Sequence, residues 1–221
     1  MRLFLVFIPV VLVISSFVWS TTTIEEMGDV ELTTYKNTLL SVDSTALSCA
    51  LKGVAAIQDS LHEKYRFVAI VDFSKPSTEQ RFYLIDLLDT SLACLDYVCH
   101  GKFSGENNTT SFSNESESNK SSLGFYKLAE AYVGLHGLSI RMDGLDQGFN
   151  NNARLRSIVM HTAAYADSTT IKELGRLGRS LGCPTLPQNT FDKFAMKLSN
   201  NAIIFHYYPD NNYLNNSVWL H

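Results

Sequence analysis

A cysteine and a histidine in the second half of the chain have the residue types of a nucleophile and its base. Cys183 lies in the segment GRSLGCP, residues 178–184, and His161 lies upstream of it. The thiolate is the reactive form of cysteine, and an imidazole, a positive charge or converging backbone N–H groups lower the pKa of the thiol. Gly182 permits a sharp turn, and Arg179 adds a positive charge nearby. The alternative is that Cys183 is a small buried hydrophobic residue, which is the usual fate of a free cysteine.

Two other kinds of site fit the sequence less well. In papain-like cysteine peptidases the nucleophile precedes its histidine, whereas only His206 and His221 follow Cys183 here, and neither has a recognisable setting. Zinc binds histidine and cysteine, but the chain has no tight Cys-x-x-Cys or His-x-x-x-His spacing. We therefore expect no metal and no cofactor.

The composition is that of a folded domain that does not bind nucleic acid. The chain has 221 residues, of which 45% are hydrophobic and 18% are charged, enough for one domain with a core. The formal net charge is −4 and both signs are dispersed, so the basic stripe that nucleic acid requires is absent.

The N-terminus is typical of an export signal. Arg2 is followed by an apolar run over 3–14, and Val18-Trp19-Ser20 offers a cleavage point, so we assign residues 1–20 to a signal peptide. The apolar run is short for a membrane span. If the signal were not cleaved, it would tether the chain to a membrane.

Export would place four cysteines in an oxidising compartment, where they could form two disulfides. A catalytic Cys183 would leave at least one of Cys49, Cys94 and Cys99 unpaired. Cys94 and Cys99 are close enough in sequence to form a bridge. If both lay on one continuous strand, their odd spacing would point them to opposite faces and block it. The sequence leaves the pairing open.

The hydrophobic pattern divides the rest of the chain into three parts. We expect residues 21–34 to form a flexible leader, and 35–62 a helical segment that Asp43, Ser44 and Gly53 could split in two. The remainder, 63–221, is a domain rich in short strands, expected at 65–73, 81–87, 92–100, 125–128, 131–135, 138–142, 156–161 and 202–208. Helices are expected at 170–177 and 191–198, the latter with Thr190 as N-cap. This pattern favours a mainly β (α+β) fold, either sandwich-like or barrel-like.

Residues 102–122 are dense in Ser, Asn, Thr and Gly. This composition fits a flexible loop or an ordered polar loop that lines a site, and composition does not separate the two.

Taken in order, several segments resemble the exported murein L,D-transpeptidases, in the divergent branch known as the murein L,D-transpeptidase catalytic domain family. The matching segments are VDFSKPS (71–77), RFYLIDL (81–87), His100-Gly101, SGE (104–106), FSN (112–114), SSLGFY (121–126), His136-Gly137, GFN (148–150), Ala153-Arg154, IVMH (158–161) and GRSLGCP (178–184). The resemblance runs from about residue 65 to 208. It implies an L,D-transpeptidase-like β-sandwich with short helices, preceded here by the helical segment, which carries no recognised motif.

The resemblance also assigns roles to residues at the site. It implies that Cys183 is the nucleophile and His161 the base. We expect the carbonyl of Thr162, or a nearby side chain, to orient the imidazole, and backbone N–H groups of the turn Ser180-Leu181-Gly182 with Cys183 to bind the oxyanion. Two departures stand out, because Leu181 replaces a second histidine and Pro184 begins a segment where an arginine is usual. The predicted substrate-binding residues are His100, His136, Gly137, Asn150, Arg154, Arg156 and Arg179. A guanidinium suits a carboxylate, so the arginines are candidate substitutes for the missing one.

The function that the resemblance implies is cysteine L,D-transpeptidation of peptidoglycan stem peptides, with 3→3 crosslinks as the product. The implied location is the periplasm or cell envelope of a bacterium. Water as the acceptor would make the protein an L,D-carboxypeptidase that releases D-Ala. A third alternative is a cell-wall-binding module that has kept the fold without the activity. The sequence distinguishes neither the acceptor, nor the third stem residue, nor the oligomeric state.

Overall fold

The computed structural model describes residues 41–221. The predicted signal peptide, the leader and the first residues of the predicted helical segment lie outside this part. Within 41–221, no helix combines the length and apolar character needed to cross a membrane.

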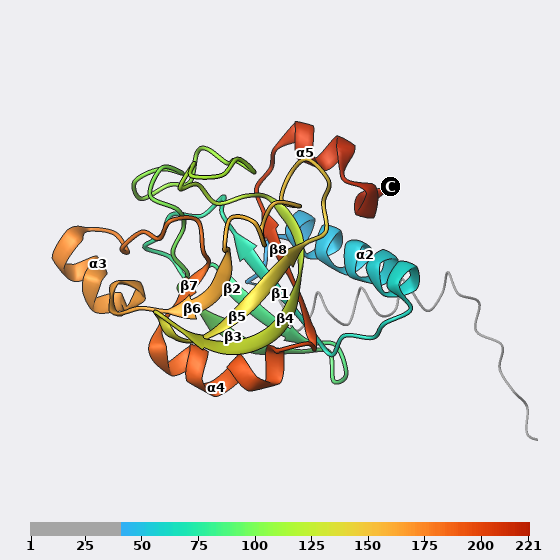
Figure 1. Cartoon of the computed structure of the whole chain (residues 1–221), viewed down its shortest axis with the longest axis horizontal. Coiled ribbons are helices and arrows are strands. Elements are labelled where there is room, and N and C mark those ends of the chain that lie inside the picture. The colour runs from blue at the N-terminus through green and yellow to red at the C-terminus, as the bar shows by residue number, and fades with distance from the viewer. Residues whose placement is uncertain (1–40) are drawn as a thin grey trace, which may run out of the picture.

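In the described part of the chain, eight strands form a single sheet in the order β3-β2-β1-β8-β4-β5-β6-β7 (Figure 1). The strands are β1 Phe67–Asp72, β2 Phe82–Asp86, β3 Ser91–Asp96, β4 Gly124–Gly134, β5 Gly137–Gly144, β6 Val159–Thr162, β7 Thr185–Leu186 and β8 Ala202–Tyr207. The β1–β8 and β6–β7 pairs are parallel, and the other neighbours are antiparallel. The helices are α2 Ser44–Leu61, α3 Ser168–Leu174, α4 Gln188–Leu198 and α5 Asn211–Asn216, with 3₁₀ turns at Ala164–Ala166 and Val218–Leu220.

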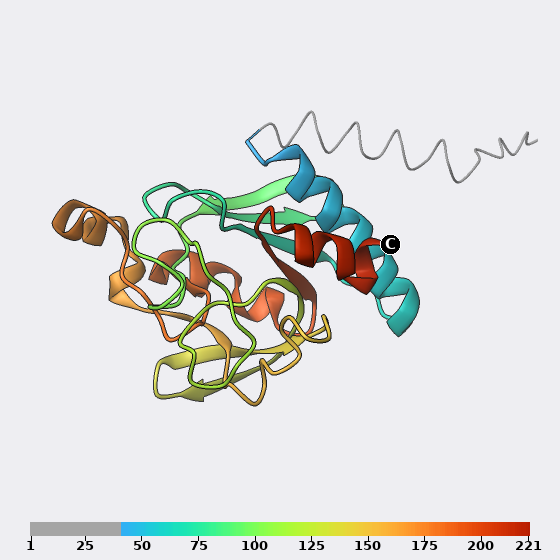
Figure 2. The same cartoon turned by 90° about the horizontal axis from the view of Figure 1, so that it is seen from above.

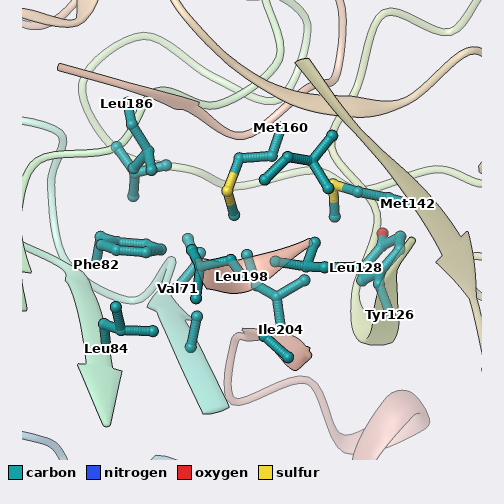
Figure 3. Close-up of a cluster of buried hydrophobic side chains, with 14 of the residues drawn as sticks. Val71, Phe82, Leu84, Tyr126, Leu128, Met142, Met160, Leu186, Leu198 and Ile204 are labelled. Atoms are coloured by element: carbon teal, nitrogen blue, oxygen red, sulfur yellow. The ribbon is translucent and has the colours of Figure 1, made fainter. Parts of the chain in front are cut away.

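Within the described residues, the two larger apolar cores lie on opposite faces of the sheet, because strand residues alternate between its faces. Val71 in β1 and Phe82 in β2 share the inner core with Met142 in β5 and Met160 in β6, although these strand pairs lie far apart in the sheet order (Figure 3). The sheet therefore curls over this core and over α4. The α+β prediction is confirmed. Where two packed sheets were expected, the described residues form one sheet that curls over the inner core.

The outer core lies between the sheet and the helix α2, next to which the C-terminal segment runs (Figure 2). Asp43 caps α2 by accepting hydrogen bonds from the N–H groups of Thr45 and Ala46 at 2.9 Å each. The predicted split at Gly53 does not occur. A Cβ at this glycine would come within 2.0 Å of the Phe125 ring, so the residue serves close packing of the helix on the sheet.

Some element boundaries differ from those expected. The two strands expected at 125–128 and 131–135 are one strand, β4, with an irregular register between Leu128 and Ala131. The helix α4 begins at Gln188 after Pro187, so Thr190 is not its N-cap; the Thr190 hydroxyl bonds the Asp96 carboxylate instead. All four cysteines are free thiols.

Candidate active site

Strands β6 and β7 bring the histidine and the cysteine segment together. The two strands pair in parallel, with His161 opposite Thr185 and Thr162 opposite Leu186. Cys183 lies two residues before Thr185, at the end of the turn that enters β7. On its other side, His161 pairs with Ser139 of β5. His161 is therefore held between strands β5 and β7. Cys183 lies in the turn directly before β7.

Ser180 closes the turn that carries the cysteine. Its Oγ accepts from the N–H of Gly182 at 3.1 Å and donates to the carbonyl of Cys183 at 2.7 Å. Gly182 has φ +123, and a Cβ there would lie 2.8 Å from the Lys120 carbonyl, so this position requires glycine. Because Ser180 engages the N–H of Gly182, the unpartnered N–H groups of this turn, within the described residues, are those of Leu181 and Cys183.

The Cys183 thiol is half-buried and rests between backbone groups. Its Sγ accepts from the N–H of Val159 at 3.5 Å and lies 3.9 Å from the carbonyl of Ser157, to which the thiol donates. Burial raises the pKa of the thiol above its usual value, while the Val159 N–H and the nearby charge of Arg156 oppose this rise. Burial therefore favours the neutral thiol over the thiolate.

The His161 ring is 2% exposed and both of its nitrogens have partners. Nδ1 lies 3.0 Å from the carbonyl of Thr162, the contact that the sequence predicted. A carbonyl only accepts, so Nδ1 carries the proton and Nε2 holds the lone pair. Nε2 faces Oγ1 of Thr185 at 3.2 Å. Burial lowers the pKa of His161, the Thr162 carbonyl opposes this, and His136 lowers the pKa further. Among the described residues, no hydrogen bond joins Sγ of Cys183 to His161.

His136 covers the histidine from the turn between β4 and β5. Its exposed ring stacks on His161 with centroids 4.3 Å apart and an interplanar angle of 22°. Gly137 follows with φ +73, the left-handed conformation that the turn requires. The structure therefore brings His136 and Gly137 to the site.

Two residues expected to bind substrate are buried elsewhere. His100 is 0% exposed, with Nδ1 2.7 Å from the Arg81 guanidinium and Nε2 3.3 Å from the carbonyl of Gly105. Asn150 is also 0% exposed; its side chain accepts from the N–H of Asp146 and donates to the carbonyl of Phe125, both at 2.9 Å. The expectation that these two side chains line the cleft is corrected, because their polar atoms are used inside the fold.

Arg156 holds the Ser/Asn-rich loop. Its guanidinium donates to the carbonyls of Ser113 (2.7 Å) and Lys120 (2.5 Å) and to the hydroxyls of Ser118 and Ser122. Ser121 of the same loop donates to the carbonyl of Gly182 at 3.4 Å. Residues 102–122 are therefore an ordered loop that packs against the turn carrying Cys183. Arg156 acts on Cys183 through its charge, and its donors are committed to the loop.

The other two arginines are paired with carboxylates. Arg154 bonds Glu130 at 2.8 Å and also bonds Asp143, and Arg179 bonds Glu106 at 2.7 Å and two backbone carbonyls of the loop. In this structure both guanidinium groups are thus paired with carboxylates of the protein. That they replace the usual arginine stays a prediction.

Sequence reasoning did not identify Thr185 as a site residue. It follows Cys183-Pro184 directly, but a strand of two residues has no hydrophobic period to reveal which neighbour it will face.

Within residues 41–221, no group of three or more His, Cys, Asp or Glu side chains is arranged to hold a metal ion.

A comparison with known protein families covers the site and most of the rest of the chain. A family model described as L,D-transpeptidase catalytic domain matches residues 39–207, so the match also includes α2, in which the sequence showed no recognised motif. No curated protein sequence matches the chain.

Several solved structures are similar to this chain at low sequence identity. An L,D-transpeptidase from Mycobacterium smegmatis is 11% identical, with 65% of this chain and 59% of that one covered and a TM-score of 0.41. L,D-transpeptidase 3 from Mycobacterium tuberculosis, in complex with a faropenem-derived adduct, is 13% identical over 65% and 61% of the two chains, with a TM-score of 0.40. An Enterococcus faecium L,D-transpeptidase mutant is 8% identical over 66% and 50%, with a TM-score of 0.39. The match thus spans less than two thirds of these proteins.

Proposed function

This chain belongs to the L,D-transpeptidase catalytic domain family, and we propose that it is a cysteine-dependent L,D-transpeptidase that joins peptidoglycan stem peptides through 3→3 crosslinks. The observation that carries the proposal is the state of His161. Its Nδ1–H donates to the Thr162 carbonyl, so the basic nitrogen is Nε2. Nε2 lies on the side of the ring that faces Thr185, two residues after Cys183 at the start of β7.

The first half of the reaction is acylation. Sγ of Cys183 attacks the carbonyl of the third stem residue, at its bond to the terminal D-Ala, and Nε2 of His161 takes the thiol proton. The substrate oxygen becomes an oxyanion, for which the N–H groups of Leu181 and Cys183 are the available donors; one such donor is worth about 3 kcal/mol in comparable sites. The amine of D-Ala then leaves with the proton from His161, and a thioester remains on Cys183.

The second half transfers the acyl group. An amine on the side chain of a second stem attacks the thioester, gives its proton to His161, and forms the 3→3 amide while Cys183 regains its thiol. Two features support an enzyme that binds its substrate without the usual arginine: the described arginines near the turn are occupied, and Leu181 is 66% exposed beside the thiol.

The proposal includes export. The supporting observation is the basic start, apolar run and cleavage point over residues 1–20, which lie outside the described part of the structure. Intact mass of the protein recovered from the cell envelope tests this, since cleavage after Ser20 would leave a chain beginning at Thr21.

The reaction itself is tested by mixing the purified chain with a disaccharide-tetrapeptide and following the products by mass. We expect a crosslinked dimer that has lost one D-Ala, and no product from Cys183→Ala. A tripeptide alone would assign the protein to the carboxypeptidases. No product, together with a Cys183 that is inert to a carbapenem, would indicate a wall-binding module. Full turnover by Cys183→Ser would contradict the thioester mechanism.

A further inference from the structure

Among the described residues, Thr185 is the one whose side chain forms a hydrogen bond with the basic nitrogen of His161. It is 0% exposed and opens β7, directly opposite His161 in the parallel β6–β7 pair. Its Oγ1 lies 3.2 Å from Nε2 of His161, 3.5 Å from the carbonyl of Cys183 and 3.5 Å from the hydroxyl of Tyr165. The buried Thr185 hydroxyl thus lies between the His161 ring and the Cys183 carbonyl.

The direction of the bond to His161 follows from the other side of the ring. The Thr162 carbonyl at 3.0 Å fixes the proton on Nδ1, so Nε2 of the neutral ring can only accept. In the resting site the Thr185 hydroxyl therefore donates to Nε2. When Nε2 gains a proton, the same oxygen must accept from it, because the ring then has only donors.

The surroundings of Thr185 allow this reversal. When Oγ1 accepts from the protonated ring, its own hydrogen can turn to the carbonyl of Cys183, and the Tyr165 hydroxyl can donate to the second lone pair of Oγ1. A threonine or serine hydroxyl is able to serve both states in this way. A valine of the same shape would leave Nε2 without a partner in a buried place, which is costly.

We propose that Thr185 is a positioning residue of the reaction: its hydroxyl donates to Nε2 of neutral His161, turns away from that single lone pair as the thiol proton arrives, and then accepts from protonated Nε2 until the proton passes to the leaving amine. This inference rests on the proposed function. A hydrogen bond to a charged group is roughly twice as strong as one between neutral groups, so the hydroxyl stabilises the imidazolium more than the neutral ring. It offsets part of the desolvation that opposes charge on His161.

Three other titratable groups act on the His161 ring or on the Cys183 thiol, so the test must separate the effect of Thr185 from theirs. His136 stacks on the ring from the β4–β5 turn, Tyr165 reaches it through Thr185, and Arg156 acts on Cys183. All three are unchanged in Thr185→Val and in Thr185→Ser. Thr170→Val is a matched control, because its buried hydroxyl bonds only the carbonyl of Ala164, at 3.4 Å.

The experiment measures acylation of Cys183 by a carbapenem in the full chain, together with the pKa of His161 from its imidazole NMR signal. We expect Thr185→Val to acylate roughly tenfold more slowly near neutral pH and to lower the pKa of His161 by about one unit, the equivalent change. Thr185→Ser should stay within about twofold of wild type, because it keeps the hydroxyl. Thr170→Val should match wild type.

Three outcomes would overturn the inference: a Thr185→Val rate equal to wild type, a slower rate with an unchanged pKa of His161, or an equal loss in Thr185→Ser. The second outcome would mark Thr185 as a packing residue only. A wild-type chain that is not acylated would refute the proposed function, which is a different result from an acylated wild type with an unaffected valine variant.

Discussion

His100 and His161 are both buried histidines, and both nitrogens of each ring form hydrogen bonds. They differ in the group that faces the nitrogen without a proton: a guanidinium in His100 and a hydroxyl in His161. Nδ1 of His100 faces the Arg81 guanidinium at 2.7 Å, and a guanidinium only donates, so Nδ1 must stay without a proton. Nε2 of His161 faces a hydroxyl, which both donates and accepts. Burial and the charge of Arg81 lower the pKa of His100 to about 4. A buried histidine can thus act as a base where the partner of its lone pair is able to change roles.

The largest expected effect comes from exchanging the two histidines in turn for glutamine. His161→Gln removes the base and should reduce transpeptidation by a factor of about 10²–10⁴. His100→Gln should keep turnover per folded molecule near wild type, because His100 reaches neither the thiol nor the surface. Product formation by mass, normalised to folded protein by circular dichroism, checks both. A collapse of activity in folded His100→Gln would break the comparison.

The next effect is on stability against pH. His100 and His206 both have a pKa near 4 in the folded chain, chiefly because burial disfavours their charge, against about 6.5 when unfolded. A lowered folded pKa gives stability that is fully present above about pH 6.5 and is lost as the pH falls toward 4. We expect a loss on the order of 2 kcal/mol per histidine by pH 5.

Urea unfolding at pH 7.5 and at pH 5 measures this loss. His100→Gln, which does not titrate, should show a smaller difference between the two pH values than wild type does. An equal difference in the two proteins would mean that His100 is not held neutral by the fold.

The smallest effect is expected at His136. Its ring stacks on His161 at 4.3 Å, and such aromatic pairs are worth about 0.5–1.5 kcal/mol. Loss of the stacked ring in His136→Ala should slow carbapenem acylation by a few-fold. The same change should raise the pKa of His161, because His136 lowers that pKa, and this rise acts in the opposite direction on the rate. His136→Phe keeps a stacking ring without a titratable group, so it separates the two contributions. A variant with unchanged rate and unchanged pKa would remove His136 from the site.

The sequence predicted most of the strands and the two residues of the proposed chemistry. Long alternating or apolar runs, such as those in β1 and β8, have a period that identifies them, and the segment around Cys183 has a distinctive motif. The two-residue strand β7 and the short helix α5 have no such period, so neither was predicted. Predictions of role for His100 and Asn150 rested on resemblance, and those for the arginines on the fit of a guanidinium to a carboxylate; neither basis carries information about burial or pairing.

The sequence by itself determined that a histidine, a turn with glycine and a thiol follow one another in this order, because these are properties of residue type and spacing. Only the tertiary structure decided what each nitrogen and each guanidinium faces. Thr185 meets His161 through the register of two parallel strands, and Arg81 meets His100 because the antiparallel pair β2–β3 brings the residues before β2 next to those after β3. The protonation states of the two histidines follow from those partners, since a carbonyl accepts, a guanidinium donates and a hydroxyl does both.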